Sequence, residues 1–236
     1  MELQPLDEDW ERAVAIVAHP DDMEFGAAGA IARWTAQGKH ITYVMVTSGE
    51  AGIDSMAPDR AGPLREREQV DSCRIVGVED VIFLRRPDGT LEHSLELRAA
   101  LCEQIRRLRP QIVMTNSYRE TWPGGLLNQA DHIAVGRASV DAVRDAGNRW
   151  IFPDAGGGLE RWDGVRQVWL PGSPAAGHAV DISATFEVGL DSLRAHAAYI
   201  EGLGGFDPAG FLDAGATAAG ERLGCRYAAT FEVLQP

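Results

Sequence analysis

The chain has 236 residues, 45% of them hydrophobic and 24% charged, which is typical of a globular protein with room for one sizeable domain. Its formal net charge is −13 at pH 7, from 22 Lys and Arg against 35 Asp and Glu. A surface this acidic repels phosphate backbones and anionic membranes, so the composition disfavours nucleic-acid binding.

The first nine residues are polar and acidic, with neither the positive region nor the apolar region of a signal peptide. No apolar run approaches the roughly 18 residues that a membrane span needs. The three cysteines, Cys73, Cys102 and Cys225, have no C-x-x-C spacing, and the first two fall on apolar stripes of predicted helices. These features favour a reducing compartment, and we expect a cytoplasmic protein.

The first part of the chain alternates between strand-like and helix-like segments. Residues 13–18 are continuously apolar, which is typical of a strand buried on both faces. We predict a helix over residues 24–37, a strand over 40–46, a helix over 64–76 after a long polar loop, and a strand over 81–84.

The alternation continues beyond the third strand. Leu97, Leu101, Ile105 and Leu108 recur on one helical face, and a fourth strand follows over residues 112–114. This spacing predicts βαβ units, and so an α/β domain with a mostly parallel sheet and helices on both faces. Ligands bind such sheets outside the carboxyl ends of the strands, so polar residues at those ends are candidates for a site.

The pattern is less regular beyond residue 150. Residues 165–170 alternate like an antiparallel or edge strand, and residues 178–181 resemble another strand. We predict a helix over residues 184–202 and assign no structure to the Ala- and Gly-rich residues 204–220.

The segment Ala18-His19-Pro20-Asp21-Asp22 directly follows the first strand. Pro20 cannot continue a strand, so the chain turns sharply after His19 and lets His19 and Asp22 converge. A histidine nitrogen and a carboxylate oxygen are zinc ligands, and Asp21 between them can accept a proton from water. A capped helix start is the alternative, but the whole segment at the end of a buried strand favours metal-assisted hydrolysis.

A second cluster, Asn128-Gln129-Ala130-Asp131-His132, opens a predicted helix. We expect His132 at the same sheet edge, where it would supply the third ligand of a catalytic zinc site with one open position. Asp131 is either a helix cap or a residue that supports the ligands from behind.

Together the two clusters resemble the PIG-L/LmbE family of zinc-dependent de-N-acetylases, over roughly residues 13–140. The segments between them that match the family in order and spacing are Thr47-Ser48-Gly49-Glu50-Ala51-Gly52, Arg65-Glu66-Arg67-Glu68 and Pro87-Asp88-Gly89. The resemblance implies a Rossmann-like, three-layer fold and hydrolysis of N-acyl groups on glucosamine-type substrates. It implies His19, Asp22 and His132 as zinc ligands and Asp21 as the general base.

The resemblance also indicates which molecules the protein binds and how far its domain extends along the chain. We expect a small-molecule substrate, an N-acylated amino sugar or its conjugate, and a bound Zn²⁺, with Fe²⁺ or another divalent metal as alternatives. A homo-oligomer is left open, as is the native metal. We expect a single domain over residues 1–236, with a core over about 13–145 and a smaller, less regular C-terminal extension over about 146–236.

One position departs from the family pattern. The second family motif usually reads His-Pro-Asp-His, and its first histidine helps to stabilise the oxyanion, but here Gln129 and Ala130 stand in place of His-Pro. A Gln amide can donate a hydrogen bond to an oxyanion, although it cannot deliver a proton. We assign Gln129 to catalysis and leave two alternatives open: an amidase for a bulkier thiol-sugar conjugate, and a zinc-binding family member with weakened deacetylase activity.

Four further residues are candidates for substrate binding. Arg65 could bind an anionic or hydroxylated group through two N–H groups, although an ordinary surface charge is the alternative. Asp88 could bond sugar hydroxyls, although Pro-Asp-Gly is also a common turn. Glu50 and Asn116 are candidates because they lie at strand ends.

Other features carry less weight. His178 and His196 are expected in packing or surface roles, and the loop at residues 122–125 is either a lid or sugar-stacking wall, or a simple anchor. A dinucleotide site is excluded because His19 and its neighbours occupy the place of the glycine-rich turn. A phosphoacceptor receiver domain is excluded because Lys39 is the only lysine and the third strand lacks the required Asp.

Overall fold

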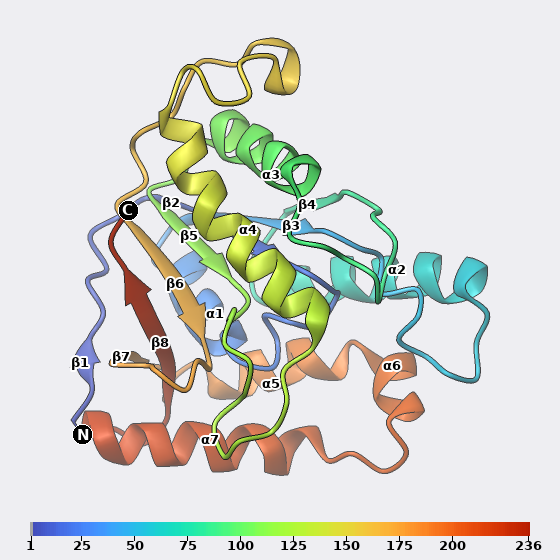
Figure 1. Cartoon of the computed structure of the whole chain (residues 1–236). Coiled ribbons are helices and arrows are strands. Elements are labelled where there is room, and N and C mark those ends of the chain that lie inside the picture. The colour runs from blue at the N-terminus through green and yellow to red at the C-terminus, as the bar shows by residue number, and fades with distance from the viewer. Residues whose placement is uncertain (1) are drawn as a thin grey trace.

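The computed structural model describes residues 2–236, which form three layers, a central sheet between two layers of helices (Figure 1). Across these residues the sheet has eight strands in the order β1-β7-β8-β6-β5-β2-β3-β4. In chain order they are β1 (Gln4–Pro5), β2 (Arg12–Val17), β3 (His40–Met45), β4 (Asp80–Phe83), β5 (Ile112–Thr115), β6 (Gln167–Pro171), β7 (His178–Asp181) and β8 (Ala228–Leu234). Neighbouring strands run parallel except that β8 is antiparallel to β6 and β7.

Helices cover both faces of the sheet (Figure 1). One face is covered by α3 (Leu95–Leu108) and α4 (Ala130–Gly147). The other is covered by α1 (Ala28–Ala36), α2 (Pro58–Ile75), α5 (Phe186–Arg194) and α7 (Pro208–Leu223). The short helix α6 (Ala197–Gly202) follows α5 in the chain.

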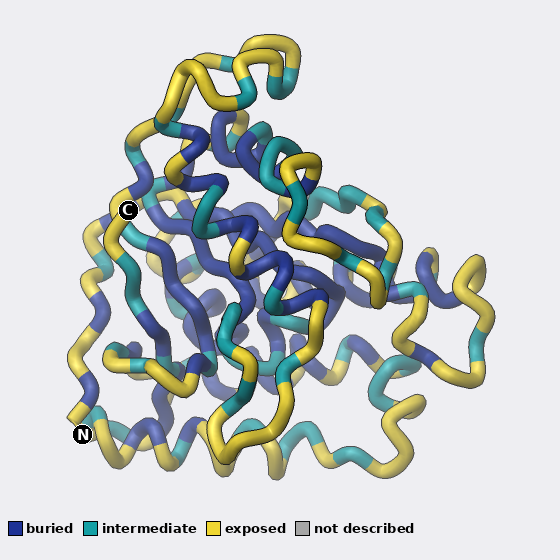
Figure 2. The backbone as a smooth tube through the Cα atoms, in the orientation of Figure 1, coloured by how far each residue is buried: buried dark blue, intermediate teal, exposed yellow. Residues whose placement is uncertain are grey.

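The central strand β2 shows why the sheet is buried on both faces. Ala15 and Val17 pack in one hydrophobic cluster with Trp34 of α1, whereas Val14 and Ile16 pack in another with α3 and α4. A strand with an apolar cluster on each side needs consecutive apolar residues rather than alternation. Figure 2 shows the result, a buried sheet between helices whose outer faces are exposed.

The predicted α/β class with a mostly parallel sheet is confirmed. Strands predicted over residues 13–18, 40–46, 81–84 and 112–114 correspond to β2, β3, β4 and β5. These four strands are adjacent and parallel, so the loops after them meet at one edge of the sheet.

Three helix predictions were wrong in their limits. The helix predicted over residues 24–37 is shorter, because α1 begins at Ala28 and the preceding residues form turns. The helix predicted from residue 64 begins earlier, at Pro58, since proline suits the first turn of a helix. The helix predicted over residues 184–202 is broken into α5 and α6.

The C-terminal residues differ most from expectation. Residues 165–170, predicted as an antiparallel or edge strand, overlap β6, which is antiparallel to β8 but lies inside the sheet, with β5 on its other side. Strand β8 was not predicted and α7 was left unassigned, although Asp207 caps α7 by accepting the N–H of Ala209. Trp169 of β6 and Phe231 of β8 belong to the same hydrophobic cluster as α1, so the extension shares the core.

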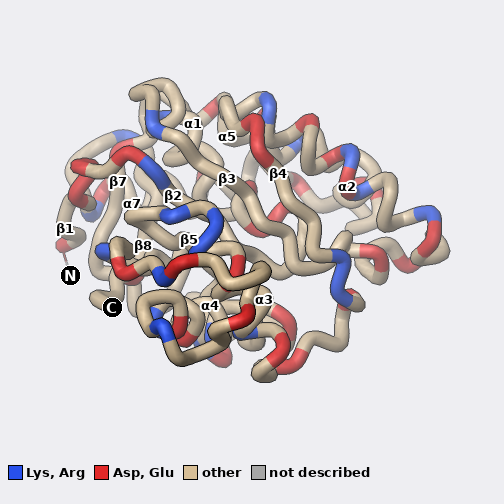
Figure 3. The backbone as a smooth tube through the Cα atoms, turned by 90° about the horizontal axis from the view of Figure 1, so that it is seen from above, with Lys and Arg blue, Asp and Glu red and all other residues tan. Residues whose placement is uncertain are grey.

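Charged residues of both signs occur throughout the chain. Figure 3 shows Asp and Glu residues interspersed with Lys and Arg around the outline of the molecule. Within residues 2–236, no helix is both long enough and apolar enough to cross a membrane.

Candidate metal centre and active site

Three potential ligand atoms converge at the carboxyl end of β2. His19 Nδ1 lies 3.2 Å from His132 Nε2 and 3.7 Å from Asp22 Oδ1, and His132 Nε2 lies 2.9 Å from Asp22 Oδ1. Ligands at about 2.0–2.1 Å from a tetrahedral zinc are separated by roughly 3.3 Å, within the spread of these three distances. The structure therefore brings together the three residues predicted as metal ligands, on the loop after β2 and the first turn of α4.

The second nitrogen of each histidine has an acceptor of its own. His19 Nε2 lies 3.0 Å from Asp88 Oδ1 and 3.3 Å from Asp131 Oδ2, and His132 Nδ1 lies 3.0 Å from Asn128 Oδ1. Each ring can donate its N–H to these oxygens, which leaves the lone pairs of His19 Nδ1 and His132 Nε2 facing each other. Two facing lone pairs repel, so this arrangement suits a shared cation.

Asp22 is oriented through its other oxygen. Its Oδ2 accepts the backbone N–H of His19 at 2.8 Å and the Nδ2–H of Asn116 at 3.0 Å. Asn116 Oδ1 in turn accepts the N–H of Ala18 at 2.8 Å, which ties the amide to the end of β2. The Asn116 amide thus contacts the carboxylate of a candidate ligand, and its contact with substrate stays a prediction.

Asp131 supports His19 from behind. Its two oxygens accept the backbone N–H groups of Gly89 at 2.7 Å and Leu91 at 3.0 Å, on the loop after β4. Burial by itself lowers the pKa of His19. The hydrogen bonds with the Asp131 and Asp22 carboxylates outweigh this effect and hold the pKa of His19 well above its usual value. Asp131 therefore lies beside a candidate ligand, and its supporting role stays a prediction.

Asp21 has a backbone conformation that is rare for aspartate. Its φ is +82°, in the left-handed region, and its N–H donates to Gln69 Oε1 at 2.8 Å. Its Oδ2 accepts a hydrogen bond from Arg65 Nη2 at 2.5 Å. Burial raises the pKa of the Asp21 carboxyl, against the opposing effect of the Arg65 charge. Two residues on one face of α2 thus hold the residue predicted as general base, Gln69 through its backbone N–H and Arg65 through its carboxylate.

Arg65 directs its guanidinium at the chain itself. Besides Asp21, it donates to the carbonyls of Pro20 at 2.8 Å and Gly49 at 2.9 Å. A Cβ on Gly49 or on Gly52 would lie 2.3 Å from Arg65 Nη1, so a side chain at either position would displace the guanidinium. In this structure Arg65 contacts the Asp21 carboxylate, and its contact with substrate stays a prediction.

Glu50 and Asp88 join the loops that follow β3 and β4. Glu50 Oε1 accepts the N–H of Asp88 at 3.0 Å, and Asp88 Oδ2 accepts the N–H of Ala51 at 2.8 Å. The other Asp88 oxygen contacts His19. Both residues lie at the predicted sheet edge, and their contact with substrate stays a prediction.

Gln129 is exposed at the start of α4, beside the metal ligands. It is the N-cap residue, although its side chain makes no capping bond. In the preceding loop, the ring of Trp122 stands edge-on to His132, with ring centres 5.8 Å apart. Trp122 thus lies beside a candidate ligand, and its role as a wall for substrate stays a prediction.

A buried polar network behind Asp21 was not foreseen. Gln69 Nε2 and the Ser72 hydroxyl both donate to Glu24 Oε1 at 2.9 Å, and burial raises the pKa of Glu24 to about 7. His196 is fully buried, 4.0 Å from Glu24, and burial lowers its pKa to about 3. The only signal in the sequence was the proximity of Gln69 to the segment at residues 65–68, since helical spacing places residue 69 one turn beyond Arg65.

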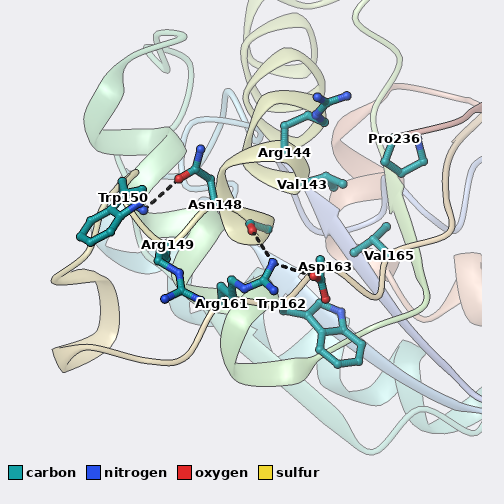
Figure 4. A pocket seen from close by; sticks show the side chains of 11 residues that line it. Val143, Arg144, Asn148, Arg149, Trp150, Arg161, Trp162, Asp163, Val165 and Pro236 are labelled. Carbon is teal, nitrogen blue, oxygen red and sulfur yellow. Dashed lines mark hydrogen bonds and ion pairs between the residues drawn. The ribbon is translucent and has the colours of Figure 1, made fainter.

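His178 and the hollow at the end of α4 both lie away from the candidate metal centre. His178 begins β7, which is separated from β2 by β8, β6 and β5. A hollow of about 680 Å³ lies at the end of α4 and is shown in Figure 4, where Arg144, Arg149 and Arg161 project around it. None of the predicted site residues lines this hollow, and Arg161 is paired with Asp163, so we do not place the chemistry there.

The family model for GlcNAc-PI de-N-acetylase (PIG-L) matches residues 14–143, more than half of the chain. The chain therefore belongs to this family, and the resemblance described from the sequence is confirmed. A 1D-myo-inositol 2-acetamido-2-deoxy-α-D-glucopyranoside deacetylase of Streptomyces scabiei is 28% identical over 193 residues, 70% of this chain and 57% of that protein. This chain thus spans little more than half of that longer relative.

Two further comparisons concern chitobiose deacetylases. The diacetylchitobiose deacetylase of Thermococcus kodakarensis is 29% identical over 191 residues, 80% of this chain and 70% of that protein. The solved structure of the N,N′-diacetylchitobiose deacetylase from Pyrococcus horikoshii has a TM-score of 0.85, 24% identity, and coverage of 97% of this chain and 85% of that chain. At this identity the structural match establishes the shared fold.

The fold alone does not fix the reaction. A 4-carboxy-2-hydroxymuconate hydratase from Pseudomonas putida has a TM-score of 0.76 at 18% identity, over 96% of this chain and 97% of that chain. Function must therefore be argued from the residues of the site.

Proposed function

We propose that this protein is a metal-dependent hydrolase that cleaves an N-acyl amide, an N-acetyl group in the first instance, on an amino-sugar-like small molecule. The observation that carries the proposal is the convergence of His19 Nδ1, Asp22 Oδ1 and His132 Nε2 beside the buried carboxylate of Asp21. Membership of the de-N-acetylase family supports the reaction class. The deacetylase activity carried in the names of two relatives supports an N-acetylated amino sugar as substrate.

The donor set fits a divalent cation in number and in type. Two imidazole nitrogens and one carboxylate oxygen form a site that leaves a position open for water. Such a ligand set accepts several divalent metals, so we propose Zn²⁺ with Fe²⁺ as the main competitor. When bound, the metal supplies Lewis acidity and lowers the pKa of water in its open position.

The chain's own residues supply the proton transfers. Asp21 accepts a proton from the attacking water, and Arg65 holds its carboxylate in place through the 2.5 Å contact. The departing amine needs a proton, and Asp21 can return the one it has taken. The Gln129 amide can donate a hydrogen bond to the oxyanion that forms on the amide carbonyl.

A weakened deacetylase is the second candidate, and Gln129 favours it. The family histidine at this position can carry charge, whereas an exposed amide gives a weaker and more mobile donor. Loss of one oxyanion donor typically costs about 10²–10³ in turnover. A bulkier conjugate as the true substrate would restore binding energy that a simple sugar cannot supply.

Metal analysis combined with amine release tests the proposal. The wild-type protein, His132→Ala and Asp21→Asn are loaded with Zn²⁺ or Fe²⁺, dialysed, and assayed with a panel of N-acetylglucosamine conjugates. We expect about one metal per wild-type chain together with amine release, loss of both in His132→Ala, and loss of amine release alone in Asp21→Asn. A wild-type protein that binds no metal would refute the proposal, and full activity in Asp21→Asn would refute the role of the base.

A further inference from the structure

Helix α6, in the C-terminal extension, lies against the group that holds the proposed base. The ring of Tyr199 covers Arg65, whose Cζ is 4.1 Å from the ring centre. The Arg65 side chain is only 3% exposed, and its Nη2 donates to Asp21. Burial, together with the charge of Asp21, raises the pKa of Tyr199 to about 12, so the phenol stays neutral.

The position of α6 is fixed by contacts with α2. Glu68 Oε1 accepts the N–H of Ala198 at 2.7 Å, which anchors the first turn of α6. The hydroxyls of Ser72 and Ser192 lie 2.7 Å apart and join α2 to α5, the helix that precedes α6. Arg65, Glu68 and Ser72 follow one another at spacings of three and four, so α2 offers them on one face.

We propose that Tyr199 is a positioning residue, whose ring shields the Arg65–Asp21 ion pair from water and so holds the proposed base in place. The inference rests on the proposed function of Asp21 and extends it to a residue outside the part of the chain that matches the family model. The C-terminal extension then has a role in the active site, because its Tyr199 ring covers the arginine that holds Asp21.

The physical reason is the local dielectric. A charged hydrogen bond is stronger when water is excluded, since competing donors and acceptors are absent. The aromatic face also attracts the guanidinium, and this attraction is stronger where water is excluded. Arg65 keeps its bonds to the Pro20 and Gly49 carbonyls without the ring, so removing the ring loosens the pair without releasing the arginine.

Substitutions that remove the Tyr199 ring and those that remove only its hydroxyl should have different effects. In the structure, over residues 2–236, the Tyr199 hydroxyl makes no hydrogen bond, so the ring is the part that acts. Tyr199→Phe should keep kcat within about twofold of wild type, and Tyr199→Ala should lower kcat about tenfold with KM little changed. Glu68→Ala should lower kcat in the same way by releasing α6, whereas Glu68→Gln should keep most of it because an amide oxygen still accepts the Ala198 N–H.

A second measurement does not depend on turnover. Phenylglyoxal modifies accessible arginines, and peptide mass spectrometry reports the rate at Arg65. We expect modification of Arg65 about tenfold faster in Tyr199→Ala than in wild type, with bound metal unchanged. Glu201→Ala is the matched control, because Glu201 lies on the same helix and is exposed. It should match wild type in every measurement.

The outcomes are distinct. Unchanged kcat and unchanged Arg65 modification in Tyr199→Ala would overturn the inference. A loss in Tyr199→Phe as large as that in Tyr199→Ala would also overturn it, because the hydroxyl would then act on substrate. A wild-type protein without amine release would refute the proposed function, whereas the modification rates would still decide whether Tyr199 shields Arg65.

Discussion

Gly52 offers a test of the contact that positions Asp21, without changing any charged residue. A Cβ at this position would lie 2.3 Å from Arg65 Nη1, whereas ordinary contacts begin at 3.4 Å. The φ of Gly52 is outside the left-handed region, so alanine is tolerated by the backbone conformation. The clash with Arg65 is the main effect, since the next contact of this Cβ outside Arg65, with the Gly49 carbonyl oxygen, is at 3.3 Å. The guanidinium must therefore move by about 1 Å, and misplacement of this size at an active site can cost about 10² in turnover.

The assay compares Gly52→Ala with Gly177→Ala. No atom lies within 4 Å of a Cβ built at Gly177, and its φ is also ordinary, so this control should behave as wild type. We expect Gly52→Ala to bind metal normally, to melt at a lower temperature, and to release amine about 10²-fold more slowly. Activity in Gly52→Ala within threefold of the control would show that Arg65 does not position the base.

Three further predictions concern other groups of the site. Asn116→Ala removes the donor that orients Asp22 and should weaken metal affinity about 10–100-fold in a chelator competition, while unchanged affinity would refute the role. Gln129→His should raise turnover or leave it unchanged, and a fall of more than about tenfold would show a loop built around the amide. His196 has a folded pKa of about 3 against 6.5 unfolded, so the unfolded state binds more protons between these values and stability falls as pH falls below 6.5. Between pH 7.5 and pH 5, the free energy of unfolding of the metal-free wild type should fall by about 2 kcal/mol more than that of metal-free His196→Gln, as measured by denaturant unfolding. An equal fall in the two proteins would contradict the assignment.

The sequence by itself determined the centre of the fold. Residues 13–18 were readable as a doubly buried strand because β2 has apolar clusters on both faces, and the alternation of strands and helices specified the parallel sheet. The candidate ligands were also readable, since His19 and Asp22 are joined by one sharp turn and the sheet rule places their loop at the edge that binds ligands. The positions of these strands and of the ligand loop can be predicted because they depend on residues that are close together in the chain.

Only the tertiary structure decided what the side chains around the ligands do. Arg65 and Asn116 have the chemistry of substrate-binding groups, but packing directs them to Asp21 and Asp22. β8 pairs with β6 across nearly sixty residues of intervening chain, so no local pattern could place β6 inside the sheet. The same holds for Tyr199, which lies 134 positions after Arg65 and meets it where α6 and α5 contact α2 through Glu68 and Ser72. Such contacts depend on which surfaces fold together, and that is a property of the whole chain rather than of any segment.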